Sequence, residues 1–187
     1  MVKLNKIYTR TGDSGSAGLV DGSRVSKASL RMIAIGEVDE ANAAIGVAVA
    51  ALGKDEVRDQ LLRIQNDLFD LGADVATPGP VEGALRIVAS QVERLEREID
   101  TMNSALAPLT SFILPSGSAG VSALHLARAV ARRAERAAVA LGEHEPLNPK
   151  ILAYLNRLSD HLFVAARHVA SREGGDILWK PGGTRDE

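Results

Sequence analysis

The sequence predicts an all-α fold, a five-helix bundle preceded by a glycine-rich N-terminal arm. Its 187 residues are 45% hydrophobic but only 3% aromatic, and this composition favours closely packed helices over a β-sandwich or barrel. Apolar residues recur in five stretches at the spacing of an amphipathic helix, and the breaks between these stretches contain glycine or proline. The predicted helices span residues 27–52, 55–76, 84–103, 116–141 and 150–173.

A single domain accounts for the whole chain. A chain of 187 residues can bury roughly 70% of its unfolded surface in one core, and no internal repeat or low-complexity tract divides it. We therefore expect one domain over residues 1–187, made of an arm (1–26), the bundle (27–172) and a tail (173–187).

Charge and cysteine content exclude several classes of protein. The formal net charge is −2, so no overall positive field recruits nucleic acid or an anionic membrane. The chain has no cysteine, which excludes disulfides, thiolate metal sites and thiol nucleophiles. Charges interrupt the apolar runs well short of a membrane span, and the N-terminus lacks a signal-peptide pattern. We expect a cytoplasmic protein with no nucleic-acid or membrane partner.

The arm has no helical period and is rich in glycine, serine and threonine, which predicts a loop with at most a short strand at residues 6–8. Gly12, Gly15 and Gly18 allow the backbone to turn sharply or to approach a ligand closely. With the clustered hydroxyls and basic flanks they suit a polyphosphate, although the GK[ST] of a Walker A loop is absent. A terminal arm without a ligand is the alternative interpretation.

The first helix carries one candidate site residue, whereas the second and third are scaffold. Helix 27–52 places its apolar residues on one stripe, interrupted by Glu37, Asp39 and Glu40. Asp39 is a candidate partner for an arginine elsewhere, although acids on a helix flank are more commonly solvated. Helices 55–76 and 84–103 are separated by a Pro/Gly-rich break and show no chemistry of their own.

Phe112 lies in the short apolar connector 106–117, directly ahead of the fourth helix. It is one of only three phenylalanines. From the sequence alone, its more common role is to plug the end of a helical bundle.

Helix 116–141 carries most of the unusual residues, and Ser116 or Ser118 is its expected N-cap. Arg128, Arg132 and Glu135 fall within an arc of about 60° with Arg136 at its edge, while small apolar residues cover much of the remaining surface. A packed helix must give such guanidiniums partners, because an unpaired buried charge is costly. Glu135 can serve one arginine and an anionic ligand the others; a solvated Arg–Glu face is the alternative.

The fifth helix, residues 150–173, carries a polar line on an otherwise apolar surface. Asn156 and Asp160 lie one turn apart, and Arg167 is on the same stripe. These side chains also need partners.

Other catalytic centres find no support in the sequence. A di-iron bundle needs Glu-x-x-His on two helices, and this motif does not occur. Among the histidines, only His161 and His168 have a spacing that could serve a metal, and no nucleophile elbow is present. Anion binding by arginine remains, since guanidiniums hold triphosphates bidentately and stabilise charge on a leaving phosphate.

The chain resembles the PduO-type ATP:cob(I)alamin adenosyltransferases, the corrinoid adenosyltransferase family, over about residues 6–172. The resemblance rests on five ordered segments, of which TRTGD and the pair RAVARRAER and NRLSD are the most specific. The segments are KIYTRTGDSGSAGL, EVDEANAAIG, FILPSG, RAVARRAER and LNRLSDHLF.

This resemblance implies a reaction and an assembly. Family members are five-helix bundles that form homotrimers, with ATP and Mg²⁺ bound between neighbouring subunits. Cob(I)alamin attacks C5′ of ATP, a Co–C bond forms and triphosphate leaves, while an external reductase supplies the electron that produces Co(I). A nucleotide- or corrinoid-binding sensor or chaperone on the same bundle is the alternative, and a helical interaction module with a solvated arginine face is a third.

The resemblance also implies roles for individual residues. Phe112 matches a phenylalanine that occupies the lower face of the corrin and displaces the axial ligand of cobalt. Arg128 matches an arginine that pairs across the interface with an aspartate, here Asp39, and Asp160 belongs to the stripe near the corrin. The nucleotide and its Mg²⁺ would be surrounded by Thr9, Arg10, Thr11, Gly12, Asp13, Gly15, Ser16, Ala17, Gly18, Lys27, Arg132, Arg133, Glu135, Arg136 and Asn156.

One position departs from the family pattern. Family arms usually read GDxGxT, whereas this chain has Ala17 in place of the last hydroxyl residue, with Ser16 beside it. A side-chain contact to phosphate or metal is therefore missing or shifted, and backbone N–H groups would do most of the cradling.

Overall fold

The computed structural model describes residues 7–185 and confirms the all-α fold of five helices. Two short strands of the arm form a small antiparallel sheet ahead of the bundle. The elements are β1 Ser16–Gly18, β2 Arg24–Ser26, α1 Leu30–Leu52, α2 Glu56–Val75, α3 Ala89–Asn103, α4 Ala119–Gly142 and α5 Pro149–Ser171.

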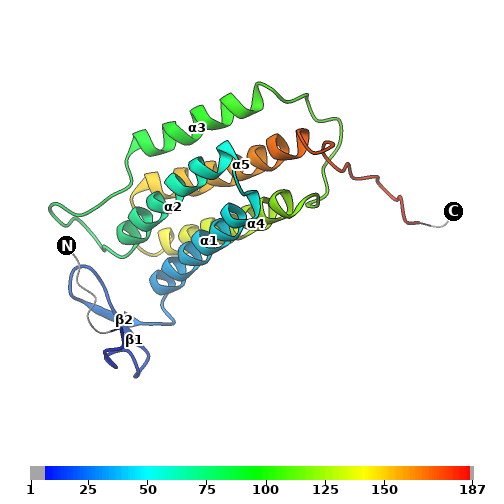
Figure 1. Cartoon of the computed structure of the whole chain (residues 1–187). Coiled ribbons are helices and arrows are strands. Elements are labelled where there is room, and N and C mark those ends of the chain that lie inside the picture. The colour runs from blue at the N-terminus through cyan, green and yellow to red at the C-terminus, as the bar shows by residue number, and fades with distance from the viewer. Residues whose placement is uncertain (1–6, 186–187) are drawn as a thin grey trace.

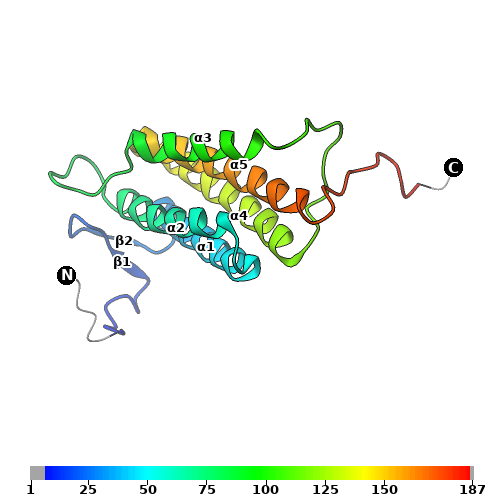
Figure 2. The ribbon, with the colours of Figure 1, turned by 45° about the horizontal axis from the view of Figure 1, so that its top comes forward.

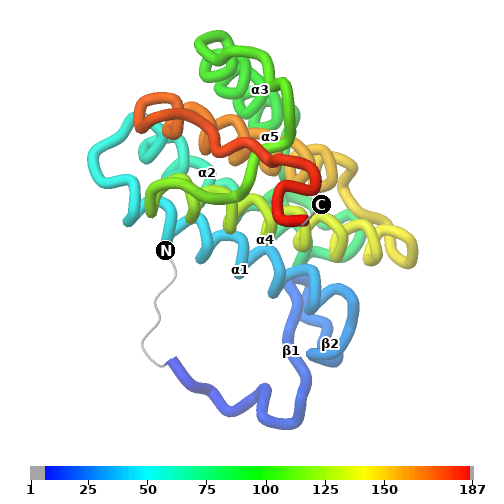
Figure 3. The backbone as a smooth tube through the Cα atoms, turned by 90° about the vertical axis from the view of Figure 1, so that its right-hand side faces the viewer, coloured from blue at the N-terminus to red at the C-terminus, as the bar shows by residue number. Residues whose placement is uncertain are grey.

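The helices pack side by side around one apolar core (Figures 1 and 2). α1 lies against α4 and α2, α4 also packs on α5, and α3 packs mainly on α5. Figure 3 shows α3 at one edge of the bundle and the arm at the opposite edge, next to α1. Both α1 and α4 bury several alanines, and small residues on packed helix faces allow neighbouring helices to approach closely. Those buried alanines are Ala34, Ala41, Ala48, Ala127, Ala131, Ala134 and Ala138.

Polar caps decide where most of the helices begin. α1 starts at Leu30 rather than at Lys27. Ser29 is its N-cap, because the Ser29 side chain accepts a hydrogen bond from the Met32 N–H. The α4 cap is Ser118, one of the two serines expected from the sequence, and it accepts from Val121.

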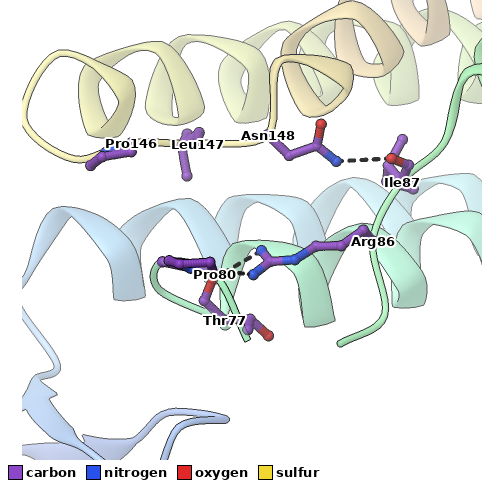
Figure 4. A pocket seen from close by; sticks show the side chains of 8 residues that line it. Thr77, Pro80, Arg86, Ile87, Pro146, Leu147 and Asn148 are labelled. Atoms are coloured by element: carbon purple, nitrogen blue, oxygen red, sulfur yellow. Dashed lines mark hydrogen bonds between the residues drawn. The ribbon is translucent and has the colours of Figure 1, made fainter. Parts of the chain in front are cut away.

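α3 starts at Ala89 rather than at Ala84, because the preceding residues serve a buried acid at the end of α2. The fully buried Asp74 carboxylate accepts hydrogen bonds from the Ile87 N–H at 2.8 Å, from Arg86 at 2.7 Å and from Asn148 at 2.7 Å. Asn148 also donates to the Ile87 carbonyl at 2.8 Å, beside a cavity of about 500 Å³ (Figure 4). A buried carboxylate needs such partners, and supplying them keeps residues 86 and 87 extended.

The arm forms a hairpin, although not at the position predicted. Lys6 lies outside the described residues, and Ile7 and Tyr8 are in no strand. Pairing occurs instead between β1 and β2, with Ala17 opposite Val25. The Val20 N–H donates to the Ala76 carbonyl at 3.1 Å and so attaches the hairpin to the end of α2.

The residues after α5 run along the connector at the end of the bundle. Leu178 pairs with Ile113 in an antiparallel bridge, so the tail lies beside the connector between α3 and α4. No helix within residues 7–185 is long and apolar enough to cross a membrane.

Candidate active site

The predicted arginine face of α4 is exposed, and one hydrogen bond links it to α5. The Arg132 side chain is 50% exposed and lies 4.0 Å from the Glu135 carboxylate. Arg136 donates to the Arg132 carbonyl at 3.0 Å, and no other partner of its guanidinium is found within residues 7–185. On α5, Asn156 donates to Glu135 at 2.9 Å. The structure therefore brings together Arg132, Glu135, Arg136 and Asn156, with two guanidiniums available to an anion.

Arg133 points to the other side of α4. Its guanidinium forms ion pairs with Glu37, at 2.5 Å, and with Glu40, both on α1. Hydrogen bonds to Glu40 and Glu37 raise the pKa of Arg133 above its ordinary value. In the isolated chain this arginine already has two acidic partners and ties α4 to α1.

The arm folds tightly around its glycines. The Lys27 ammonium lies 3.1 Å from the point that a Cβ on Gly12 would occupy, so any larger residue there would press against it. The Lys27 N–H donates to the Gly15 carbonyl at 2.8 Å. Arg10 has a φ of 62° and packs over the Tyr8 ring. Positive φ is uncommon outside glycine and marks a tightly constrained turn.

Arg24 organises the hydroxyl-rich part of the arm. It donates to the Thr11 carbonyl at 2.7 Å and to the Ser16 side chain at 2.9 Å, while the hydroxyls of Thr9 and Thr11 lie 2.9 Å apart. Asp13 is exposed. In the described part of the chain, no hydrogen bond or ion pair joins the arm residues 9–18 to the exposed arginine face of α4. A single subunit therefore carries these two halves of the predicted nucleotide site without joining them.

Phe112 is 77% exposed and does not plug the bundle, which corrects the role expected from the sequence. It lines the mouth of a cavity of about 300 Å³ at the end of the bundle. The connector and helices α4 and α5 build this cavity from Leu109, Phe112, Ile113, Pro115, His125, Arg128 and Phe163.

Two polar side chains in this cavity are unpartnered. The Arg128 Nε is sealed from solvent and has no hydrogen-bond partner among residues 7–185. His125 is 4% exposed, and its Nδ1 is likewise unpartnered. Burial, together with the positive charge of Arg128, lowers the pKa of His125 below its ordinary 6.5. The cavity therefore combines an apolar wall with the His125 imidazole, whose neutral form is favoured, and with the Arg128 guanidinium, whose buried Nε has no acceptor among the described residues.

Asp39 does not meet Arg128 within one subunit. It is exposed on α1 and lines a largely apolar groove of about 450 Å³ between α1 and α2. Neither an ion pair nor a hydrogen bond of Asp39 is found in the described part of the chain. The predicted pair requires a second subunit.

The polar line on α5 is divided among different partners. Asp160 is exposed and forms a 3.0 Å ion pair with Arg157, which also binds Glu96 on α3. Arg167 is buried and bound to Asp176 of the tail at 3.0 Å. His161 and His168 bind Glu98 and Glu56 separately, so they do not share a metal.

Three residues near Phe112 were not among those predicted. Phe163 and His125 lie on helices, where an apolar or lone polar residue resembles ordinary core. Trp179 is the only tryptophan in the chain, a weak signal in a segment expected to be a tail. Its ring centroid lies 6.1 Å from that of Phe112, a contact that depends on the fold of the tail.

Comparisons with known proteins agree with this geometry. The family model described as Cobalamin adenosyltransferase matches residues 7–169. The corrinoid adenosyltransferase of Mycobacterium leprae is 49% identical over 191 residues, covering 97% of this chain and 99% of that protein. The cobalamin adenosyltransferase of Cupriavidus metallidurans is 50% identical, covering 95% and 96% of the two chains.

A solved structure extends the agreement to three dimensions. A phenylalanine-to-alanine variant of the PduO-type ATP:corrinoid adenosyltransferase from Lactobacillus reuteri, complexed with cobalamin and ATP, superimposes with a TM-score of 0.89. It is 36% identical, and the match covers 94% of this chain and 99% of that one. The chain belongs to the cobalamin adenosyltransferase family.

Proposed function

We propose that this protein transfers the 5′-deoxyadenosyl group of ATP to the cobalt of cob(I)alamin, which yields adenosylcobalamin and triphosphate. The observation that carries the proposal is the match, over 94% of the chain, to a corrinoid adenosyltransferase complexed with both cobalamin and ATP. The near-complete match to the corrinoid adenosyltransferase of Mycobacterium leprae and the cobalamin adenosyltransferase of Cupriavidus metallidurans supports it.

The exposed face of α4 suits the departing triphosphate. Co(I) supplies the electron pair of the new Co–C bond, and the pair of the broken C5′–O bond leaves with triphosphate. In the described part of the chain, Arg132 pairs only with Glu135 and Arg136 donates only to the Arg132 carbonyl. Guanidinium N–H groups that remain available stabilise negative charge that develops on a leaving phosphate. Glu135 and Asn156 hold the face in position through their 2.9 Å hydrogen bond. No general base is required, because no proton moves in this step.

The arm supplies the other half of the nucleotide site in this proposal. Thr9, Arg10, Thr11, Asp13 and Lys27 present hydroxyls and charges, and the glycines bring backbone N–H groups close to phosphate oxygens. Ala17 lies in β1 opposite Val25 and carries no hydroxyl. The neighbouring Ser16 hydroxyl accepts from Arg24, which leaves its O–H free to donate to a phosphate oxygen, so Ser16 and the backbone N–H groups together would provide the contact that Ala17 lacks.

The donor set fits Mg²⁺ bound mainly through the nucleotide. Residues 7–185 contain no group of three or more His, Cys, Asp or Glu side chains able to hold a metal. Mg²⁺ is usually held by one or two carboxylates together with substrate phosphates, and Glu135 is the carboxylate beside the arginine face. When bound, the ion would neutralise phosphate charge.

Arg133 has a separate, structural role in this proposal: its ion pairs with Glu37 and Glu40 hold α4 against α1 beside the site.

The cavity behind Phe112 suits the lower face of the corrin. An exposed phenyl ring can exclude water and ligands from cobalt without coordinating it, and a cobalt centre without an axial ligand is more easily reduced from Co(II). Asp160, one turn from Asn156 on α5, would face the corrin side. Reduction itself needs an external reductase, which we place with the protein in the cytoplasm.

A homotrimer would complete the site. The outward side of α1 is unusually apolar for a surface helix, with Ile33 43% and Val47 57% exposed, and such a face calls for cover. Among residues 7–185, the buried Arg128 Nε has no hydrogen-bond partner and Asp39 has no ion pair. A neighbour's Asp39 carboxylate against Arg128 would satisfy both, and would bring the arm of one subunit to the arginine face of the next.

Anaerobic incubation of the protein with reduced cobalamin and ATP tests the proposal. We expect the absorbance to change to that of base-off adenosylcobalamin, with one triphosphate released for each corrinoid consumed. Binding of ATP and cobalamin without triphosphate release would instead identify a sensor or chaperone.

A further inference from the structure

The tail and the connector form a two-stranded segment at the end of the bundle. Both leave the same end, the connector between α3 and α4 and the tail after α5 (Figure 1). The Leu114 N–H donates to the Ile177 carbonyl at 2.8 Å, and the Trp179 N–H donates to the Phe112 carbonyl at 2.8 Å. The backbone of Phe112 is therefore held by the tail.

The two exposed aromatic rings of this segment touch each other. Phe112 and Trp179 are 77% and 44% exposed, with ring centroids 6.1 Å apart and planes inclined by 59°. This tilted arrangement is a favourable aromatic geometry. The Ser111 hydroxyl donates to the Trp179 carbonyl at 2.9 Å and adds a second link beside the rings. The core does not orient the Phe112 ring, so its orientation depends on the tail.

Arg167 on α5 anchors both strands of this segment at once. Its Nε donates to the Asp176 carboxylate of the tail at 3.0 Å, and its NH2 group donates to the Ala107 carbonyl of the connector at 2.8 Å. The side chain is only 8% exposed. Burying a guanidinium is costly unless its partners are well placed, and here those partners lie ahead of Phe112 in the connector and ahead of Trp179 in the tail.

We propose that Arg167 is a positioning residue for the corrin site: it fixes the tail against the connector so that Trp179 holds the Phe112 ring at the lower face of cobalt. This inference rests on the proposed function. Arg167 touches neither substrate, and it acts through Asp176 and the backbone pairing that follows. The tail is thereby part of the site that favours Co(II) without an axial ligand.

The test compares full-length variants in the presence of ATP and Co(II) cobalamin. The variants are Arg167→Lys, Asp176→Asn, their double variant, Trp179→Ala and Trp179→Phe. Electron paramagnetic resonance measures the fraction of bound Co(II) that is four-coordinate, and adenosylation is measured from Co(II) with a weak reductant and from pre-reduced Co(I). Arg172→Lys is the matched control, because Arg172 forms a 2.8 Å ion pair with Asp55 from the same end of α5 without touching the connector.

We expect Arg167→Lys and Asp176→Asn each to lower the four-coordinate fraction about tenfold, and the double variant to lower it no further, since the residues act as one unit. Trp179→Ala should lower the four-coordinate fraction to a similar extent, and Trp179→Phe should keep most of the wild-type fraction. Adenosylation from Co(I) should change little in all of them, as should every readout in the control.

Two results would overturn the inference. One is an unchanged four-coordinate fraction in Trp179→Ala, whose exposed side chain can be removed without unfolding the protein. The other is an equal loss of adenosylation activity from Co(II) and from Co(I), in proportion to the decrease in melting temperature among the variants. If the wild-type protein forms no adenosylcobalamin from Co(I), the proposed function fails instead, and the two failures are thereby distinguished.

Discussion

Asn156 on α5 donates a 2.9 Å hydrogen bond to the Glu135 carboxylate on α4, whose other oxygen lies 4.0 Å from Arg132. The polar residues of two helices thus form one connected group on the surface of the bundle. Because Glu135 is shared, it does not fully neutralise Arg132. The guanidinium remains available for a more highly charged partner, and this is the basis of the first prediction.

Arg132→Ala should reduce kcat/KM for adenosylation roughly 30- to 1000-fold, which corresponds to about 2–4 kcal/mol of lost charge stabilisation. Steady-state kinetics with ATP and pre-reduced cobalamin measure the effect. Arg97→Ala, an exposed arginine on α3, is the matched control and should retain wild-type kinetics. A variant of Arg132 with unchanged kcat/KM would remove the arginine face from the nucleotide site.

Asp39→Asn and Arg128→Ala should each weaken assembly, and the double variant should be no worse than the stronger single change. Removing one member of a buried charge pair leaves the other unpaired, which costs more than the pair contributes. Sedimentation velocity at several protein concentrations measures the trimer–monomer balance, and a double-mutant cycle measures the coupling. Additive effects would show that the two residues do not meet.

A matched pair within one subunit controls for general destabilisation. Arg172 and Asp55 form a 2.8 Å ion pair between α5 and the start of α2. A double-mutant cycle of this pair should give a coupling free energy of less than about 1 kcal/mol, as is typical of ion pairs near the surface. The variants should leave the trimer–monomer balance unchanged.

Phe112→Ala should separate reduction from alkyl transfer. Because the ring is 77% exposed, its loss should change the free energy of unfolding by less than about 1 kcal/mol. Adenosylation from Co(II) with a weak reductant should fail, whereas adenosylation from Co(I), which has no axial ligand to lose, should be largely spared. Leu85→Ala, which removes a 53% exposed side chain ahead of α3, is the control and should leave adenosylation from both Co(II) and Co(I) unchanged. Equal losses from both oxidation states would show that the ring does not control axial coordination.

His125 should make stability depend on pH. Burial and the nearby Arg128 lower its pKa in the folded state below 6.5, with Asp176 opposing the shift. Near and below pH 6.5 the unfolded chain therefore binds a proton that the folded chain does not, so stability decreases as the pH falls through this window. Chemical denaturation of wild type and His125→Gln at several pH values measures the difference.

The pH profile of His125→Gln should be flatter than that of wild type from about pH 7 to 5. His161 and His168 remain in both proteins, bound to Glu98 and Glu56, so the difference between the two profiles reports on His125 alone. Parallel profiles would show that His125 is protonated in the folded state as readily as in the unfolded chain.

The sequence by itself determined the five helices and the grouping of residues along each of them. Helical periodicity and local caps such as Ser118 are properties of neighbouring residues, so the grouping of Arg132, Glu135 and Arg136 on one face of α4 could be predicted before any packing was known, whereas the exposure of that face could not. The ordered motifs likewise predicted the family, because they record the types and spacing of residues and need no knowledge of contacts.

Only the tertiary structure decided how distant segments meet. The late start of α3 depends on a buried carboxylate, Asp74, that recruits the backbone of Ile87 from beyond the loop. The exposure of Phe112 and its contact with Trp179 depend on a tail that turns back and pairs with the connector. Arg133 pairs with Glu37, which lies 96 positions earlier in the chain, only because α1 packs against α4. Such contacts join residues far apart in the chain, and a local pattern carries no information about which of them the packing brings together.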